Sequence, residues 1–280
     1  MKKIIKIRKM LCMICVFLVF LISNSFLYSY LQTNADEAVE EELWEHASAQ
    51  AEETFTLDDV MEYDSSGVEK AEDEEADEQT GEEIDIRSFD KNDWKIMLIN
   101  KQHPIPDDYE FTLAVIKGSM KCDERIIPEL QQMMQAAQND GVSLVIRSPY
   151  RDYERQIYLF NRKIKNYMKS KMSYLESYRT TAQAVTVPGA SEHQVGLALD
   201  ITSDTYTTLT EGFADTEAGE WLENHSYEYG FILRYPDGKE DITGISFEPW
   251  HFRYVGKNAA KYMYDHELTL EEFVAQLNDQ

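Results

Sequence analysis

The chain has 280 residues, of which 52 are acidic and 27 basic, and its formal net charge at pH 7 is −25. A chain this acidic is repelled by phosphate backbones, which excludes nucleic acid as a partner. Two of its three cysteines lie near the N-terminus, so a disulfide framework is excluded and any folded part must rest on a hydrophobic core. The length allows one or two domains.

The first 35 residues have the pattern of a membrane-targeting segment. A basic start precedes residues 10–31, which are mostly apolar and long enough to cross a bilayer. Small residues at 33–35 offer a cleavage site, so a cleaved signal peptide and an uncleaved signal anchor both stay open, and we favour the anchor. In either case the rest of the chain is expected on the extracytoplasmic side. The basic residues are Lys2, Lys3, Lys6, Arg8 and Lys9.

Residues 36–91 are dominated by acidic side chains, with 23 Asp and Glu residues against only Lys70, Arg87 and Lys91. A segment with so much charge and so few large apolar residues cannot bury enough surface to offset the entropy lost on ordering. We therefore predict a disordered acidic spacer at 36–91, followed by one folded domain at 92–280.

The folded domain is predicted to mix short strands with helices. The strands do not alternate with helices in a βαβ rhythm, so the sequence favours the α+β class, with a small antiparallel sheet flanked by helices. In chain order we expect a strand at 111–116, a helix at 123–139, a strand at 142–146, a long helix from 152 past 167, a helix at 174–184, a strand at 198–201, a helix at 217–229, strands at 231–234 and 250–254, and helices at 257–265 and 268–278.

Two short segments carry residues suited to metal chemistry. The first, residues 191–200, reads SEHQVGLALD, and the second, residues 248–251, reads EPWH. Two imidazoles and one carboxylate, from His193, His251 and Asp200, form the ligand set of a catalytic zinc site with an open fourth position. Glu248 is then free to act as the base.

The spacing in the first segment constrains its local structure. His193 and Asp200 are seven residues apart, an odd spacing that would place them on opposite faces of a plain strand. A loop around Gly196 must therefore re-aim one of the two side chains, and His251 must come from a neighbouring strand. Each residue alone is more simply explained by a loop, a turn or packing, whereas the set together indicates a metal site.

A third segment, residues 147–156, follows a short apolar strand and precedes the long helix. This position aims side chains out of the end of the sheet. Arg151 in this segment could polarise a scissile carbonyl and stabilise an oxyanion. Without the zinc motif, a surface turn capped by Asp152 would be the simpler interpretation.

These segments together resemble the VanY-type D-alanyl-D-alanine carboxypeptidases. The likeness covers nearly all of residues 98–256 and rests on Ser-x-Tyr-Arg, Ser-x-His-x6-Asp and Glu-Pro-Trp-His, in that order along the chain. The chain departs from the family at Pro149, where glycine is common, and at Val195, where serine or threonine is common. These departures bear on substrate fit alone. Further matching stretches lie at 99–101, 104–106, 188–194, 230–236 and 242–244.

The resemblance implies a hedgehog-like or D,D-peptidase-like zinc domain that binds Zn²⁺ through His193, Asp200 and His251. It implies Glu248 as catalytic base and acid and Arg151 as the carbonyl-polarising residue. The implied reaction is removal of the C-terminal D-alanine from peptidoglycan stem peptides, by a protein that we expect to be a monomer. Substrate-binding candidates are Ser191, which would hydrogen-bond the substrate terminus, and Ser148, Tyr150, Gln156 and Trp250.

Three other functions remain open from the sequence. An L,D-carboxypeptidase or a stem-peptide endopeptidase would use the same fold, and the absence of a recognisable wall-binding repeat argues mildly against the endopeptidase. A non-catalytic zinc module, as in hedgehog signalling domains, would not need a base, and this chain keeps Glu248. A membrane anchor followed by a spacer suits an enzyme that reaches from the membrane into the cell wall.

Overall fold

A computed structural model describes residues 54–68 and 84–279, which belong to a compact unit at 50–280. The predicted signal peptide or anchor at 1–35 lies outside the described residues, as does the spacer at 36–53 and 69–83. No helix among the described residues is both long enough and apolar enough to span a bilayer.

The centre of the domain is a four-stranded antiparallel sheet in the order β3-β4-β6-β5. Every residue of β4 is buried, because this strand is paired on both edges and covered on both faces. A separate hairpin pairs β1 with β2. The predicted α+β class with a small antiparallel sheet is confirmed. The strands are β1 (Leu113–Lys117), β2 (Met120–Asp123), β3 (Leu144–Ser148), β4 (Ala198–Ser203), β5 (Phe231–Leu233) and β6 (His251–Tyr254).

The helices largely follow the predicted pattern. Asp152 caps the long helix α4 by accepting a hydrogen bond from the backbone N–H of Arg155, and Ser173 forms a capping box with Glu176 at the start of α5. The helix predicted from residue 123 instead opens with a 3₁₀ turn before α3. The helices are α2 (Leu57–Met61), α3 (Ile127–Asn139), α4 (Tyr153–Lys169), α5 (Tyr174–Ala184), α6 (Glu217–His225), α7 (Glu240–Thr243), α8 (Lys257–Asp265) and α9 (Leu270–Asn278).

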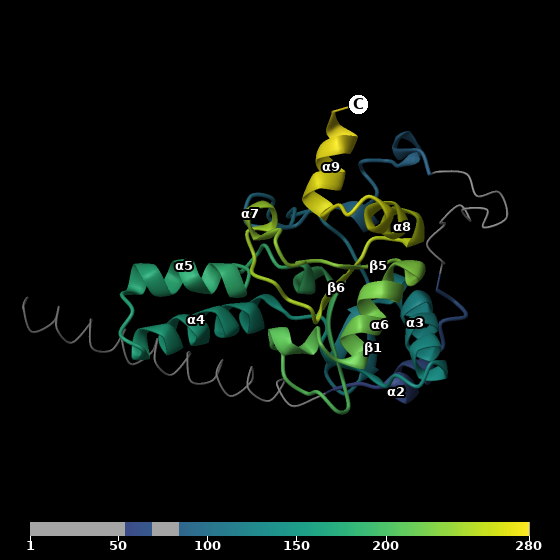
Figure 1. Ribbon diagram of the computed structural model, residues 1–280, viewed down its shortest axis with the longest axis horizontal. Coiled ribbons are helices and arrows are strands. Elements are labelled where there is room, and N and C mark those ends of the chain that lie inside the picture. The colour runs from purple at the N-terminus through teal and green to yellow at the C-terminus, as the bar shows by residue number, and fades with distance from the viewer. Residues whose placement is uncertain (1–53, 69–83, 280) are drawn as a thin grey trace, which may run out of the picture. The chain divides into compact units, whose positions relative to one another are not determined.

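The larger hydrophobic core joins the sheet to α3 and α6, with Leu130, Leu199 and Phe252 all fully buried in it. Cys122 is a free cysteine buried in this core. A second core lies between α8 and α9 around Phe273. Figure 1 shows α3 and α6 next to each other, α8 and α9 near the C-terminus, and α4 and α5 as a pair that extends from the sheet.

Part of the predicted acidic spacer is folded, which corrects the prediction of disorder there. Phe55 is fully buried and exchanges two backbone hydrogen bonds with Ile146, of 3.2 and 2.9 Å. Val60 of α2 is also fully buried in the larger core, and Phe89 packs edge-on against Phe273 in the second core. Average composition hides such isolated apolar residues among many carboxylates. The domain therefore begins before residue 92.

Candidate metal centre and active site

Three side chains converge at the centre of the sheet. Asp200 on β4 lies directly opposite His251 on β6, and His193 reaches them from a 3₁₀ turn that precedes β4. His193 Nε2 and His251 Nδ1 lie 3.3 Å apart, and they lie 3.3 and 3.2 Å from Asp200 Oδ1. Two nitrogen ligands at about 2.0–2.1 Å from a tetrahedral zinc ion are separated by about 3.3–3.4 Å. The triangle therefore fits zinc.

The chain reaches this geometry through a tight turn at Gly196. Its φ of 72° is in the left-handed region, and a Cβ placed on it would lie 2.5 Å from the backbone nitrogen of Asp123. That nitrogen donates a 3.1 Å hydrogen bond to the Gly196 carbonyl. Only glycine permits both the conformation and the close approach. The turn brings His193 to the same side as Asp200, as the odd spacing predicted.

An oxygen atom lies behind each of the two imidazoles. His193 Nδ1 lies 2.8 Å from the carbonyl oxygen of Pro149, to which it can only donate, so Nε2 keeps its lone pair for a metal. The outer nitrogen of His251, Nε2, lies 3.5 Å from Glu192 Oε2. A carboxylate or carbonyl behind each imidazole is the usual arrangement around a metal ligand.

Glu192 was not predicted as a site residue, although it lies inside the first motif. Its carboxylate is fully buried, and Oε1 accepts hydrogen bonds from Arg234 Nε at 2.7 Å and Arg253 Nη1 at 3.0 Å. Burial alone would raise the pKa of Glu192, but the two guanidinium groups outweigh it and hold the pKa far below its usual range. Arg234 in turn binds Glu271 on α9 through two hydrogen bonds of 2.8 and 2.7 Å.

The second motif folds into a turn that returns Glu248 to the metal triangle. The backbone N–H of His251 donates a 3.0 Å hydrogen bond to the Glu248 carbonyl, with Pro249 in the second position of the turn. Glu248 Oε2 consequently lies 3.8 Å from His251 Nδ1. Burial, reinforced by the nearby charge of Asp200, raises the pKa of Glu248 to about 8 despite the opposing effect of His251.

Arg147 lies in β3 and Arg151 follows this strand, and only Arg151 is directed to the site. Arg151 Nη2 lies 3.5 Å from Asp200 Oδ2, and its buried Nε makes no hydrogen bond within the described part of the chain. Its backbone N–H donates to the carbonyl of His193 at 3.1 Å, which fixes the segment against the metal turn. Arg147 instead donates to Thr202 and to the carbonyl of Ser203, so its guanidinium has a structural task.

The charge state of the metal-free triangle follows from its surroundings. Burial, with Arg151 nearby, lowers the pKa of His193 to about 4. Burial also opposes the charged form of His251, but hydrogen bonds to Asp200 and Glu192 outweigh it and raise the pKa of His251 to about 9. Asp200 stays ionised, because the imidazoles and Arg151 outweigh burial and depress its pKa. The metal-free triangle therefore carries one proton, on His251, in the position where a metal cation would bind.

The other predicted substrate residues have mixed surroundings. Ser191 is buried two residues before His193, and Ser148 lies opposite Asp200 at the end of β3. Tyr150 is half-buried with its ring near Phe111. Two candidates already serve the fold: Gln156 is fully buried and donates a 2.7 Å hydrogen bond to the Thr186 carbonyl, and Trp250 packs against the larger core.

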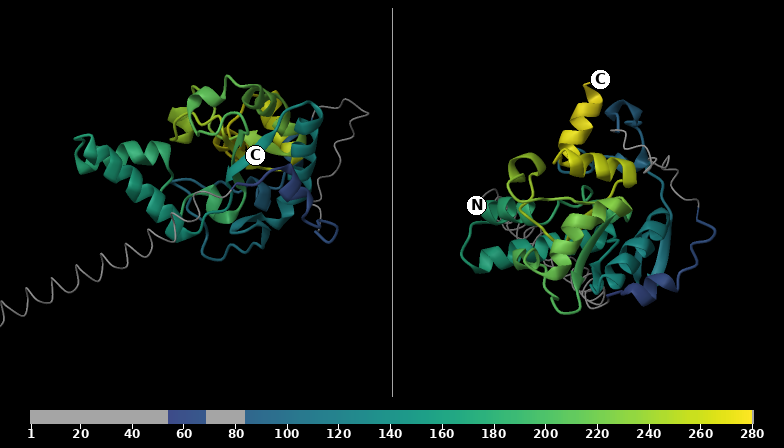
Figure 2. Two further views of the ribbon diagram at one scale, coloured as in Figure 1. Left: turned by 90° about the horizontal axis from the view of Figure 1, so that it is seen from below. Right: turned by 45° about the vertical axis from the view of Figure 1, so that its right-hand side comes forward.

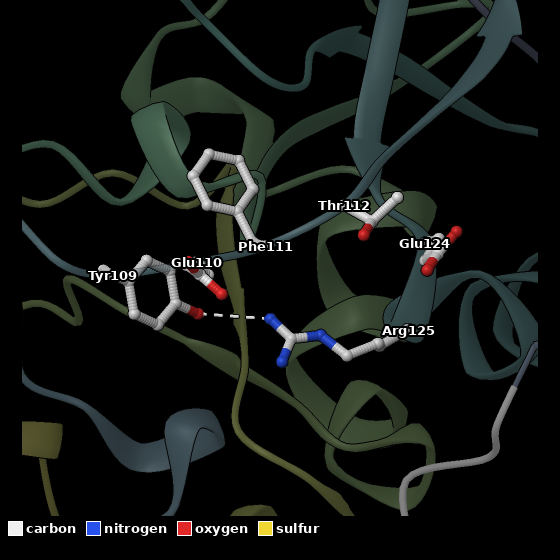
Figure 3. Close-up of a pocket in the computed structure, with 6 residues that line it drawn as sticks. All are labelled: Tyr109, Glu110, Phe111, Thr112, Glu124 and Arg125. Atoms are coloured by element: carbon white, nitrogen blue, oxygen red, sulfur yellow. Dashed lines mark hydrogen bonds between the residues drawn. The ribbon is translucent and has the colours of Figure 1, made fainter.

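A separate cavity of about 490 Å³ lies beside the β1–β2 hairpin and contains none of the metal-triangle residues (Figure 3). Arg125 crosses it and donates a 3.2 Å hydrogen bond to the Tyr109 hydroxyl. The same guanidinium stacks 3.6 Å from the ring centre of Trp94 and pairs with Asp123. These contacts join the start of the domain to β2, which is a structural role.

Comparison with known proteins agrees with the geometry. A family model described as VanY, D-alanyl-D-alanine carboxypeptidase, matches residues 119–257. The D-alanyl-D-alanine carboxypeptidase of Enterococcus faecalis is 40% identical over 187 residues, which cover 66% of this chain and 67% of that protein.

Two solved structures are similar at the level of the fold. VanYB in complex with D-alanine-D-alanine is 40% identical with a TM-score of 0.61, over 65% of this chain and 98% of that one. A variant of the vancomycin resistance D,D-pentapeptidase VanY in complex with Zn(II) is also 40% identical, with a TM-score of 0.60, over 65% and 99%. The chain therefore belongs to the VanY D-alanyl-D-alanine carboxypeptidases, which are zinc-dependent hydrolases.

Proposed function

We propose that this protein removes the C-terminal D-alanine from peptidoglycan stem peptides, with His193, Asp200 and His251 as its zinc ligands. The observation that carries the proposal is the triangle of three buried ligand atoms, each 3.2–3.3 Å from the next, which leaves the fourth position of a tetrahedral zinc ion without a protein ligand in this group. Relatives of the same family have been solved with Zn(II) and with D-alanine-D-alanine, which supports both the metal and the substrate class.

Zinc at this position supplies a nucleophilic water at neutral pH and a positive charge beside the scissile carbonyl. The task that remains for the chain is proton transfer. Glu248 Oε2 lies 3.8 Å from His251 Nδ1, and Glu248 is not part of the group of three metal-ligating side chains. We assign it to take the proton of the attacking water and to deliver it to the leaving amine.

Arg151 is assigned to the carbonyl oxygen of the scissile bond. Its Nε is a buried donor that meets no acceptor within the described residues, so it is available for an oxygen of the substrate. A donor held in this way stabilises the negative charge that develops in the transition state. Ser191, buried two residues before His193, is assigned to hydrogen-bond the substrate terminus.

Glu192 is assigned a positioning role. Two arginines fix its Oε1, and this leaves Oε2 directed at the outer nitrogen of His251. An acceptor at that nitrogen keeps the proton on Nε2 and the lone pair on Nδ1, where the metal binds. The rigid base for this contact comes from Glu271 and α9 behind Arg234.

The N-terminal segments are assigned to delivery of the enzyme. A signal anchor or cleaved signal at 1–35 would place the domain outside the membrane, and acidic stretches before residue 84 would supply reach into the wall. The domain itself is proposed to act as a monomer, because its three metal ligands and its base all come from one chain.

The proposal is tested with purified protein and a peptide ending in D-Ala-D-Ala. Free D-alanine should be released from the acid, and release should stop on zinc chelation and return with added zinc. The C-terminal amide should be nearly inert, because it lacks the carboxylate that a carboxypeptidase recognises. Equal cleavage of acid and amide would indicate an endopeptidase, and release from a tetrapeptide alone would indicate L,D-cleavage. Retention of stoichiometric zinc by His251→Ala would contradict the ligand assignment.

A further inference from the structure

The α4–α5 hairpin, residues 153–184, differs in charge from the rest of the chain. It contains seven Lys and Arg residues and two Glu residues, a net charge of +5 in a protein whose total is −25. No acidic residue occurs between Arg155 and Leu175. Five of the cations are exposed side chains: Arg162, Lys165, Lys169, Lys171 and Arg179.

The outer end of the hairpin also exposes large apolar side chains. Tyr174 is 61% exposed and Leu175 56% exposed, and both begin α5 directly after the turn. Single exposed apolar residues need no explanation, but a group of them at one end of an element is unusual for a monomeric protein. The other members of this group are Met168, Met172 and Tyr178.

The fold does not cover this group. The inner faces of α4 and α5 already pack on each other through Phe160, Ile164 and Ala182. Contacts with the body lie at the base of the hairpin, where Lys101 Nζ donates to the Ala182 carbonyl at 2.7 Å and Ser246 N donates to the Gln183 carbonyl at 2.8 Å. Figure 2 shows the turn between the two helices pointing away from the sheet.

We propose that the outer end of this hairpin docks on an anionic lipid bilayer, with Met172, Tyr174 and Leu175 inserted among the headgroups and Lys169, Lys171 and Arg179 against the lipid phosphates. Apolar side chains within a ring of cations are the combination that interfacial binding requires. A soluble anionic polymer would be bound by the cations alone and would leave the apolar side chains without a function.

The large negative charge of the rest of the protein does not prevent this contact. At physiological ionic strength the Debye length is about 8 Å, so charges elsewhere in the domain are screened at the bilayer surface. Each Lys or Arg held near an anionic leaflet strengthens binding about fivefold. The local charge of the hairpin therefore determines binding.

The test uses residues 50–280, because the apolar segment at 10–31 would bind vesicles by itself. This unit contains both hydrophobic cores. In the related VanY structure, 65% of the present chain corresponds to 99% of a chain that is folded without further segments. The protein is sedimented with vesicles of phosphatidylcholine containing one-third phosphatidylglycerol, and with vesicles of phosphatidylcholine alone.

Wild-type protein should bind the anionic vesicles and bind the neutral vesicles at least tenfold more weakly. K169Q/K171Q/R179Q should weaken binding to the anionic vesicles about 10- to 100-fold, from the loss of three surface cations. M172S/L175S should weaken it by about tenfold or more through lost apolar burial. All these residues are exposed and distant from the metal ligands, so the folded state and D-alanine release in solution should not change.

K91Q/K117Q/K261Q is the matched control, because it removes three exposed cations elsewhere in the domain; it should bind the anionic vesicles as the wild type does. Equal binding by the control and hairpin triple variants, or no binding by the wild type, would overturn the proposal. Binding to soluble poly(glycerol phosphate) as strong as to vesicles, and unaffected by M172S/L175S, would instead identify a wall polymer as the partner. A dimer in analytical ultracentrifugation that M172S/L175S abolishes would identify a second copy of the chain.

Discussion

Two carboxylates flank His251, and the structure gives them opposite properties. Glu192, on the outer side, is paired with two arginines that depress its pKa. Glu248, on the metal side, has no arginine in hydrogen-bond contact among the described residues, and burial raises its pKa to about 8. Both glutamates lie next to the same imidazole and have little exposure, since the Glu192 side chain is fully buried and that of Glu248 is 12% exposed. Partner cations, and not burial itself, therefore decide whether a carboxylate is a fixed anion or an exchanger of protons.

The largest effect is expected from Glu248, the carboxylate that exchanges protons. Glu248→Gln keeps the size and polarity of the side chain but cannot accept a proton, so kcat should fall by about 10²–10⁴-fold or more. Zinc should remain bound, because the three ligands are unchanged. Zinc content by atomic absorption and D-alanine release measure the two quantities separately. Turnover near that of the wild type would mean that another group is the base.

Arg151 contacts the metal ligand Asp200, and its removal should have the next largest effect on turnover. Arg151→Ala removes a donor for the carbonyl oxygen, so kcat should fall by about 10²–10³-fold with a smaller change in KM. Steady-state kinetics on a D-Ala-D-Ala-ended peptide separate the two parameters. If KM rises while kcat is kept, Arg151 binds the terminal carboxylate instead. Arg147→Ala serves as a control, because Arg147 binds Thr202 and Ser203 and is predicted to affect stability alone.

Glu192, the carboxylate that two arginines hold in place, should affect metal affinity. In Glu192→Gln the amide oxygen would stay with Arg234 and Arg253, so its NH₂ would face the N–H of His251 and no acceptor would remain there. We expect zinc to bind about 10- to 100-fold more weakly. Competition with a chromophoric chelator measures this. A folded Glu192→Gln protein with wild-type zinc affinity would show that the 3.5 Å contact does not orient His251.

Proton release on zinc binding measures the protonation of Glu248 separately from that of His251. At pH 7 His251, with a pKa of about 9, holds a proton that zinc must displace from Nδ1, whereas His193 is already neutral because its pKa is about 4. Glu248→Gln should thus release about one proton per zinc. The wild type should release more, since Glu248 is mostly protonated below pH 8 and the positive charge of bound zinc would lower its pKa. Zinc affinity should fall as pH decreases from 9. Calorimetry in buffers of different ionisation enthalpy counts the protons, and equal release by both proteins would contradict the assignment to Glu248.

The metal triangle was within reach of the sequence, because His193, Asp200 and His251 lie in two short motifs whose spacing and residue types are informative together. The buried network of Glu192, Arg234 and Arg253 could not be predicted from the sequence. The two arginines lie 42 and 61 residues after Glu192, and a charged residue considered singly indicates a solvated surface. The folded stretch around Phe55 was missed for a similar reason, since its partner Ile146 is remote in the chain and only tertiary contact reveals its burial.

The smallest effect is expected at Glu271 on α9, which Arg234 connects to Glu192. This carboxylate accepts two hydrogen bonds from Arg234 and one of 3.1 Å from Asn100, but it does not contact His251. Glu271→Gln removes one charge-assisted pair, so the free energy of unfolding should fall by about 1–3 kcal/mol. Arg234 keeps its 2.7 Å bond to Glu192, so the orientation of His251 and the zinc affinity should not change. Urea denaturation and chelator competition test both parts. A loss of zinc affinity as large as in Glu192→Gln would mean that α9 itself positions the metal ligand His251, through Arg234 and Glu192.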